Sequence, residues 1–454
     1  MHMAKQSVKY VCQNCGAQYS AWAGRCSQCG EWNTIAEEVH LVSSAGSGGK
    51  QSHAKPLELQ PVKTATAHTE ARMQTGISDI DTVLGGGLVP GGVVLIAGQP
   101  GIGKSTLLLQ LASTVAQKQK VLYISGEESE HQIGMRASRL GAQATSLQLG
   151  TTNSADDSAA TIATGNFQLV IVDSIQTLQA TGVSSAPGSV SQITNSTNVL
   201  LRAAKESNTA LLVVGHVTKE GSIAGPKLLE HIVDVVLTLE GDAYGGFKLL
   251  RATKNRFGPT TEVAILEMDE RGLRPVLNPS EALLEERQVT DGSVVLATLE
   301  GTRPVLVEVQ ALVNKTSYGY PKRAASGIDI NRVNLLIAML ERRTKLKLAE
   351  QDIYINIVGG LKLSDPAADL AVCMAIGSAA KGLKLKQNAV VFGEVGLSGE
   401  VRHVSAIDKR IAEAKKLGFD VAIGPRQRGG NKKSDPYLYV VGDVRTALNA
   451  FLEQ

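Results

Sequence analysis

The nine residues Gly98-Gln-Pro-Gly-Ile-Gly-Lys-Ser-Thr106 constrain this chain more than any other stretch of its 454 residues. They fit the pattern G-x-x-x-x-G-K-[ST], in which glycines let backbone N–H groups turn towards a phosphate. The apolar run at 93–97 predicts a buried strand before the loop, and the leucines at 107–109 and 111 predict a helix after it. A plain glycine turn between a strand and a helix is the alternative. The complete motif in this setting favours a phosphate loop.

Each part of the loop suits a nucleotide with its magnesium ion. Lys104 is predicted to reach the β- and γ-phosphates, and the Ser105 hydroxyl to hold Mg²⁺. The helix that follows adds the partial positive charge of its N-terminus. The predicted binding loop comprises Gly98, Gln99, Pro100, Gly101, Ile102, Gly103, Lys104, Ser105 and Thr106.

Polar residues follow three further apolar runs. The run at 121–125 leads to Glu127, the run at 169–172 ends in Asp173, and the run at 210–215 ends in His216. Carboxyl ends of parallel strands meet at one ligand-binding edge, so Glu127 is predicted to orient water and Asp173 to hold the Mg²⁺ hydration shell. For the acidic stretch at 127–130, an acidic first turn of the next helix is the alternative, and both can hold if Glu127 points inward and the other acids cap the helix. His216 is either a γ-phosphate sensor or a structural histidine, and the sequence leaves both open.

Four of the five cysteines form two C-x₂-C pairs separated by ten residues. Each pair turns tightly enough for two thiolates to meet one ion, and four thiolates make a closed, structural Zn²⁺ site. Disulfides are the alternative, but such pairs in an intracellular chain favour zinc. Trp22 and Trp32 are interpreted as the small core of this knuckle, and a platform for a nucleobase is the alternative. The four predicted ligands are Cys12, Cys15, Cys26 and Cys29.

Composition excludes several classes of function. The net charge is only +3, so any nucleic-acid surface must be local. Aromatic residues make up 4% of the chain, which argues against base stacking as the main binding mode. No run is long and apolar enough to span a membrane, and the N-terminus lacks a signal-peptide pattern. A cytoplasmic protein without a membrane partner is expected.

The chain is predicted to have four parts. Residues 1–35 form the zinc knuckle, and residues 36–70 form a flexible linker rich in Ser, Gly and Thr. Residues 71–275 form an α/β nucleotide-binding domain, and residues 285–454 form a second α/β domain. Within the last part, a half-buried strand is predicted at 304–313, a helix at 331–343 and a strand at 352–358.

Two loops are candidates for contacts with a polymer, and two cations are candidates for contacts with a neighbouring subunit. The loops at 176–198 and 217–227 follow neighbouring strands, and they are candidates for gripping a polymer; the helix between them is predicted at 199–205. Lys254 and Arg256 follow the strand at 247–252. They are either fingers that reach a neighbouring subunit's nucleotide or a solvated hairpin tip.

A group of basic residues marks the C-terminal part. It is either a surface for the phosphate backbone of DNA or a solvated face with acids nearby, and the near-neutral net charge leaves both open. The residues are Lys315, Lys322, Arg323, Arg332, Arg342, Arg343, Lys345 and Lys347.

The four cysteines, the phosphate loop, Leu169–Asp173 and Lys254-Asn-Arg-Phe-Gly258 together resemble the bacterial RadA (Sms) DNA-repair family over essentially the whole chain. The resemblance implies a RecA-like ATPase core between a zinc finger and a Lon-protease-like domain, with ATP, Mg²⁺ and Zn²⁺ as cofactors. It implies a hexameric motor that loads on single-stranded DNA, acts on branched DNA and extends heteroduplex with RecA during recombinational repair. It also implies that Lys254 and Arg256 act across the subunit interface.

The resemblance to Lon proteases fails at the nucleophile. Those enzymes use a Ser–Lys dyad, in which the lysine activates the serine. Here Ala367 stands where the serine is expected, and Asp408, or Lys409 if the register slips by one, stands where the lysine is expected. The domain is therefore expected to build a ring and bind DNA. An ATP-gated peptidase, a nucleotide-gated scaffold and a RecA adaptor without motor activity are the alternatives.

Overall fold

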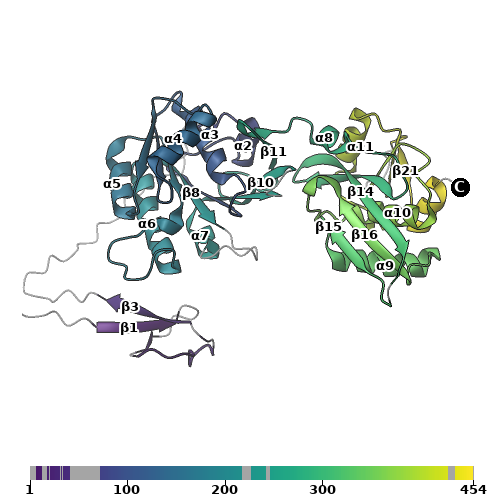
Figure 1. Ribbon diagram of the computed structural model, residues 1–454, viewed down its shortest axis with the longest axis horizontal. Coiled ribbons are helices and arrows are strands. Elements are labelled where there is room, and N and C mark those ends of the chain that lie inside the picture. The colour runs from purple at the N-terminus through teal and green to yellow at the C-terminus, as the bar shows by residue number, and fades with distance from the viewer. Residues whose placement is uncertain are drawn as a thin grey trace, which may run out of the picture. The chain divides into compact units, whose positions relative to one another are not determined.

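The computed structural model describes residues 7–12, 18–19, 21–30, 32, 34–40, 72–216, 226–241, 246–317, 319–427 and 435–452 (Figure 1). Contacts divide the chain into two units. The first comprises residues 1–69 with 184–186, and the second comprises residues 70–183 with 187–454. Within the described ranges, no helix is long and apolar enough to cross a membrane.

The first unit holds a small antiparallel sheet in the order β2-β1-β3. Its strands are β1 (Ser7–Cys12), β2 (Gln18–Tyr19) and β3 (Ile35–His40). The predicted end of the knuckle at residue 35 is wrong, because residues 36–40 continue the ladder with β1 up to the pair Ser7 and His40. The rest of the predicted linker lies outside the described residues.

The second unit contains a nine-stranded sheet in the order β12-β11-β10-β9-β4-β8-β7-β5-β6. The six strands from β9 to β6 are parallel, and the other three are antiparallel. The strands are β4 (Val93–Gly98), β5 (Val121–Ser125), β6 (Leu147–Thr151), β7 (Leu169–Asp173), β8 (Ala210–His216), β9 (Val235–Gly241), β10 (Lys248–Asn255), β11 (Val263–Asp269) and β12 (Gly272–Pro275). The helices are α2 (Ser78–Val83), α3 (Lys104–Ala116), α4 (Glu130–Arg139), α5 (Ala155–Gly165), η1 (Ile175–Thr177), α6 (Val190–Glu206) and α7 (Pro226–Ile232).

The two faces of this sheet bury separate cores. Along β4, Val94 and Ile96 pack into the core that also holds the leucines of α3. Val93 and Leu95 point to the opposite core, where helices α5 and α6 pack. Because every residue of β4 is buried, the strand carries an unbroken apolar run, as is typical of parallel strands covered by helices on both faces.

Helix α6 begins nine residues before the predicted start at residue 199. The Ser189 hydroxyl caps it by accepting from the Gln192 N–H. Ile193 and Leu200 then lie on one face and are buried in the sheet's second core. The loop predicted at 176–198 is therefore wrong over residues 190–198, because burial of these side chains outweighs the weak helix propensity of a Ser/Thr/Asn-rich stretch.

A seven-stranded sheet in the order β15-β16-β14-β13-β17-β20-β21 forms the centre of the C-terminal part. Its strands are β13 (Ser293–Glu300), β14 (Arg303–Lys315), β15 (Arg323–Ser326), β16 (Gln351–Ile357), β17 (Ala389–Val391), β20 (Val421–Gly424) and β21 (Leu438–Val440), with β18 (Glu394–Val395) and β19 (Val401–Arg402) as a separate hairpin. The helices are α8 (Pro279–Leu284), α9 (Ile330–Thr344), η2 (Val358–Gly360), α10 (Ala368–Lys381), α11 (Ile407–Lys416) and α12 (Val444–Phe451). The predicted half-buried strand is wrong over residues 305–309, all of which are buried, because α8, α10 and α11 pack on β14.

Candidate nucleotide site

Strand register brings the predicted site residues to one edge of the nine-stranded sheet. Gly98, at the end of β4, pairs with His216 at the end of β8. Asp173, at the end of β7, pairs with Ser125 at the end of β5. Because β4, β5, β7 and β8 are parallel, these four positions share the carboxyl edge, where a parallel sheet offers a binding crevice. Glu127 follows two residues after β5.

Glycines shape the phosphate loop between β4 and α3. Gly101 and Gly103 have φ angles of 78° and 113°, which side chains rarely adopt. A Cβ at Gly103 would also lie 2.7 Å from Cε of Met268, and one at Gly98 would lie 2.7 Å from the Leu239 carbonyl oxygen. The loop backbone is thereby held in the form that presents N–H groups to an anion.

Lys104 opens helix α3 and folds over the loop. Its side chain is only 4% exposed, and Nζ donates to the carbonyls of Gly98 at 2.8 Å and Gln99 at 2.9 Å. Burial lowers the pKa of Lys104, while the negative charges of Asp173 and Glu127 act to raise it. A buried cation between a glycine loop and two carboxylates fits the phosphates and metal ion of a nucleotide.

The two carboxylates are held by hydroxyl groups. Asp173 is buried, and its Oδ2 accepts a hydrogen bond of 2.6 Å from the Tyr123 hydroxyl. The Oε1 atom of Glu127 accepts from the Ser174 hydroxyl and lies 3.3 Å from Nε2 of His216. No sequence pattern predicts the contact of the Tyr123 hydroxyl with Asp173 or of the Ser174 hydroxyl with Glu127. Tyr123 was detectable in principle, because a tyrosine in an aliphatic strand needs a partner for its hydroxyl.

The backbone around Glu127 is fixed by its neighbours. The Ser125 hydroxyl accepts from the N–H groups of Glu127 at 3.3 Å and Glu128 at 2.9 Å. Glu128 then forms two hydrogen bonds with Arg136 of α4, at 2.8 and 2.5 Å. Helix α4 begins only after its cap at Ser129, so Glu127 lies before the first helical turn and not within it.

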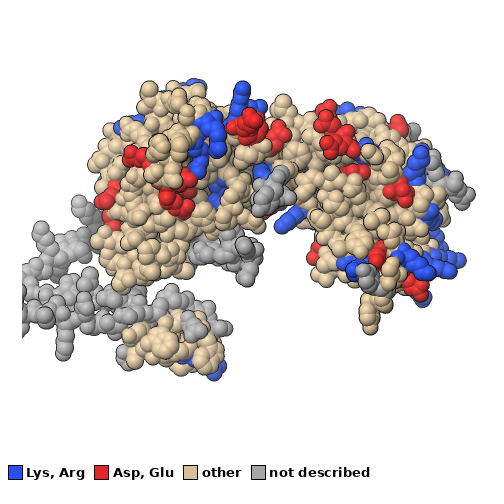
Figure 2. Space-filling model, in the orientation of Figure 1, with Lys and Arg blue, Asp and Glu red and all other residues tan. Residues whose placement is uncertain are grey.

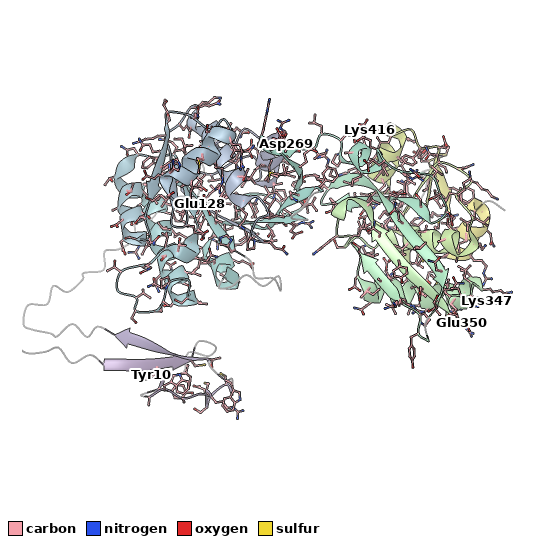
Figure 3. All side chains as sticks on the ribbon, in the orientation of Figure 1. Tyr10, Glu128, Asp269, Lys347, Glu350 and Lys416 are labelled. Carbon is pink, nitrogen blue, oxygen red and sulfur yellow. The ribbon has the colours of Figure 1, made fainter. Side chains whose placement is uncertain are left out.

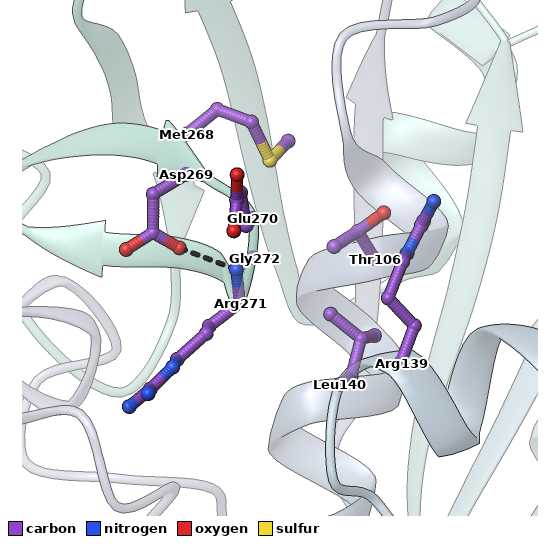
Figure 4. A pocket seen from close by; sticks show the side chains of 8 residues that line it. All are labelled: Thr106, Arg139, Leu140, Met268, Asp269, Glu270, Arg271 and Gly272. Atoms are coloured by element: carbon purple, nitrogen blue, oxygen red, sulfur yellow. Dashed lines mark hydrogen bonds between the residues drawn. The ribbon is translucent and has the colours of Figure 1, made fainter.

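A cavity of about 650 Å³ lies beside the start of α3 (Figure 4). Figure 4 shows Thr106 of α3, Arg139 of α4 and the residue that follows it, Leu140, on one side, and the turn between β11 and β12 on the other. The turn is closed by the Arg271 N–H, which donates to Asp269 at 2.7 Å. The cavity has the volume that a small-molecule ligand requires, and it adjoins the last residue of the phosphate loop.

Lys254 and Arg256 lie at the opposite edge of the sheet. Asn255 pairs with Val235 at the start of β9, whereas the phosphate loop follows Gly98, which pairs with Leu239 further along β9. Nζ of Lys254 donates to the carbonyls of Glu230 and Val233, at 2.5 and 2.7 Å. Arg256 is half-exposed and pairs with Asp234 at 3.1 Å. The fold therefore does not bring these two cations to the chain's own phosphate loop.

Three of the four predicted zinc ligands come together in the first unit. The Sγ atoms of Cys12, Cys26 and Cys29 all lie within 4.8 Å of one another; Cys15 lies outside the described residues. The Tyr19 hydroxyl bonds Sγ of Cys26 at 3.0 Å, and chiefly this bond lowers the pKa of Cys26 to about 6. Clustered thiols, one of them readily ionised, fit a Zn²⁺ site.

The interpretation of the two tryptophans as the knuckle's core is wrong. Trp22 is 60% exposed and Trp32 is 67% exposed. Among the described residues of this unit, those with buried side chains are instead Cys12, Cys26 and Ile35. A unit this small has little core in which to bury large side chains, and the two indole rings remain outside it.

The residues predicted to stand at the positions of the Lon dyad contact other side chains and backbone groups of this chain. Ala367 is fully buried, and its N–H donates to Asp365 at 3.0 Å. Asp365 pairs at 2.8 Å with Arg410, which has no exposed surface. Asp408 accepts from Gln427, and Lys409 donates to the Thr302 carbonyl at 3.1 Å. Acyl transfer has no attacking oxygen at Ala367, which argues against the peptidase alternative.

Replacing Arg410 with methionine is expected to destabilise the C-terminal domain by about 3–5 kcal/mol, because it leaves the Asp365 charge inside without its partner. Calorimetric unfolding of the full chain measures the effect. Lys415→Met, on the same helix, is the matched control: it removes a more exposed pair with Asp435, for which about 0–1 kcal/mol is expected. An equal loss of unfolding free energy in the two variants would contradict the role of Arg410 as the partner of the Asp365 charge inside the domain.

The basic residues of the C-terminal part do not form one free surface. Arg332 pairs with Asp369, whose carboxylate is buried, so the charge of this arginine is balanced within the domain. Lys315, Lys345 and Lys347 line a hollow of about 630 Å³ together with two glutamates. Figure 2 shows lysine and arginine gathered at this end of the domain, where Figure 3 labels Lys347 and Glu350. The lysines and the acids lie together there, so both interpretations stay open.

Three family models match separate parts of the chain. The AAA domain model matches residues 54–222, which include the phosphate loop, Glu127, Asp173 and His216. A rubredoxin metal-binding domain model matches residues 10–37, with all four cysteines. A model described as subunit ChlI of Mg-chelatase matches residues 321–428. The first two matches imply ATP, Mg²⁺ and Zn²⁺ as cofactors, in agreement with the geometry of the two sites.

Curated relatives match almost the whole chain. A protein of Halalkalibacterium halodurans named DNA repair protein RadA is 46% identical over 455 residues, covering 99% of this chain and 100% of the relative. Proteins of the same name from Bacillus subtilis and Pseudomonas aeruginosa are 46% and 44% identical, again covering 99% of this chain and 100% of each relative. A solved structure titled as that of the RadB recombinase is 24% identical with a TM-score of 0.36, covering 45% of this chain and 99% of that one.

Proposed function

This chain belongs to the family of DNA repair protein RadA, and on that premise we propose that it is an ATP-driven DNA motor of recombinational repair. ATP hydrolysis would move the protein along single-stranded DNA and extend heteroduplex in branched intermediates, together with the recombinase RecA. The one observation that carries the proposal is the meeting of Lys104, Glu127 and Asp173 at the carboxyl edge of a parallel sheet.

The residues divide the chemistry of hydrolysis between them. Lys104 neutralises charge on the β- and γ-phosphates, and the backbone N–H groups of the loop cradle them. The Ser105 hydroxyl and Asp173 would hold Mg²⁺ and its water shell, which supplies further charge neutralisation when bound. Glu127 orients the attacking water and takes its proton as a general base. His216, beside the Glu127 carboxylate, is suited to sense the γ-phosphate that this water attacks.

Completion of the site by a neighbouring subunit is the second part of the proposal. Lys254 and Arg256 lie at the amino edge of the sheet, so they face away from their own phosphate loop. In a closed ring, the amino edge of one subunit meets the nucleotide of the next, where a cation stabilises the charge of the transition state. We propose a hexamer, in which the C-terminal domain supports the ring and binds DNA.

ATP turnover with and without single-stranded DNA tests the motor. The full chain is expected to hydrolyse ATP only with Mg²⁺, and single-stranded oligonucleotides should raise the rate several-fold. Because phosphate contacts weaken as salt rises, the DNA stimulation should decline at higher ionic strength while basal turnover changes little. Turnover that is indifferent to DNA at every salt concentration would instead support a nucleotide-gated scaffold.

A further inference from the structure

Two buried hydroxyl groups each occupy one oxygen of a catalytic carboxylate. We propose that Tyr123 and Ser174 are positioning residues of the ATP site. Tyr123 turns Asp173 so that Oδ1 faces the Mg²⁺ shell, and Ser174 fixes Glu127 so that Oε2 faces the attacking water. The inference deepens the proposed ATPase activity and rests on it.

Strand geometry places Tyr123 beside Asp173. Ser125 of β5 pairs with Asp173 of β7, and Tyr123 lies two residues before Ser125. Side chains two residues apart share one face of a sheet, so the tyrosine points to the face on which Asp173 lies. It is 1% exposed, and its hydroxyl donates to Oδ2 at 2.6 Å, the short distance of a charge-assisted hydrogen bond.

The hydrogen bond between Tyr123 and Asp173 is buried, because the two residues are 1% and 7% exposed. Rotation of the Asp173 carboxylate would break this bond in a region that water does not reach. Oδ2 is therefore committed to the tyrosine, and Oδ1 is the oxygen left for the metal's water shell.

Ser174 stands in a corresponding relation to Glu127. It has no exposed surface, and its hydroxyl donates to Oε1 of Glu127. Its own carbonyl accepts from the Thr177 hydroxyl at 2.8 Å, which fixes the main chain at the start of η1. The serine is therefore a rigid anchor on a packed segment.

Glu127 needs such an anchor more than Asp173 does. Its side chain is 41% exposed and has one more rotatable bond than aspartate, so unrestrained it would populate several rotamers. His216 approaches the same oxygen, Oε1, at 3.3 Å. Because both neighbours meet Oε1, the geometry leaves Oε2 to accept the proton of a water molecule.

Substitution of Tyr123 and substitution of Ser174 are expected to impair ATP hydrolysis in different ways. Tyr123→Phe removes only the hydroxyl, and it should raise the Mg²⁺ concentration for half-maximal turnover about tenfold, as loss of an outer-shell partner does. Ser174→Ala should lower kcat about tenfold through misplacement of Glu127, while KM for ATP and the Mg²⁺ dependence stay at wild-type values. Each variant thus controls for the other.

Matched controls separate these effects from the general loss of a hydroxyl group that donates one hydrogen bond. Tyr437→Phe removes a hydrogen bond to the Phe419 carbonyl in the C-terminal domain, and Ser158→Ala removes one to the Ser154 carbonyl on α5. Both controls should retain wild-type kinetics. In a Glu127→Gln background, Ser174→Ala should cause no further loss in single-turnover rate, because a positioning residue has nothing left to position.

A binding measurement keeps the test independent of turnover. Affinity for a fluorescent ATP analogue is measured with and without Mg²⁺. Tyr123→Phe should reduce the gain in affinity that Mg²⁺ provides, and Ser174→Ala should leave it unchanged. Wild-type kinetics and wild-type Mg²⁺ gain in both variants would overturn the inference while leaving the ATPase proposal intact. A wild-type chain that binds Mg²⁺ and ATP without hydrolysing it would overturn the ATPase proposal instead.

Discussion

Lys104→Ala is expected to lower the rate of ATP turnover by about 10²–10³-fold, which is what removal of one preorganised electrostatic contact costs. The lysine is the buried cation of the phosphate loop, and no other Lys or Arg of the described residues hydrogen-bonds this loop. Steady-state phosphate release by the full chain measures the loss. DNA-stimulated and basal turnover should fall together, because both use the same site.

The variant must be separated from a folding defect. Nζ of Lys104 donates to the Gly98 and Gln99 carbonyls, and alanine leaves both unpaired. Lys104→Met keeps the apolar stem and removes only the charged group, so it should be equally inactive with a thermal midpoint closer to that of the wild type. Lys118→Ala, an exposed position just after α3, should retain full activity. Activity in Lys104→Met above about a tenth of the wild-type level would contradict the assigned role.

The carboxyl edge of the sheet was predictable from sequence because its signals are local. The phosphate loop has a fixed spacing, and buried parallel strands are apolar along their whole length, so the residues that end them stand out. Asp173 and His216 end strands as predicted, and Glu127 follows one within two residues. A sequence pattern of this kind identifies which residues reach the edge.

The contacts that hold those residues come from pairing across the sheet and packing, which the sequence does not display. Tyr123 and Asp173 are fifty residues apart, and they meet only because β5 and β7 are neighbours in the register found. Arg410 and Asp365 likewise form a buried pair between distant segments. The two residues of each pair are not separated by a helix or strand repeat, so a single sequence does not indicate that they are in contact.

The incorrect predictions for the start of α6 and for the two tryptophans have one physical cause. Helix α6 begins at Val190 because tertiary packing outweighs propensity in a polar stretch. Trp22 and Trp32 were assigned to a core on the general rule that large apolar residues are buried, and a unit this small cannot bury them. In each case the burial of a side chain depended on neighbours that local sequence does not identify.

Mixing two inactive variants is expected to restore ATP turnover if Arg256 acts on a neighbouring subunit. Loss of an arginine finger costs about 10³–10⁵ in kcat, so Arg256→Ala alone should be nearly inactive. In a mixed ring, an Arg256→Ala subunit keeps its phosphate loop, and a Lys104→Ala neighbour supplies the missing arginine. Some interfaces of the mixture are then complete, and turnover should rise far above that of either variant alone.

Strand register is the reason to expect exchange between subunits. The position of β9 paired with Asn255 and the position paired with Gly98 are four residues apart, which is about 13 Å along a strand. The phosphate loop continues from Gly98 to Lys104 at the start of α3, so a nucleotide bound there would lie farther still from Arg256 of the same chain. An arginine that faces Asp234 at the amino edge cannot serve the site on its own chain.

The matched control for the mixing experiment is the double variant Lys104→Ala/Arg256→Ala. Mixed with Lys104→Ala, it offers no intact phosphate loop in any subunit, so turnover should stay at background whatever the ratio. If Arg256 only stabilised its own subunit through the pair with Asp234, every Arg256→Ala subunit would remain defective and mixing would restore nothing. Recovery in the first mixture with none in the second therefore requires that the arginine and the phosphate loop of one working site belong to different chains.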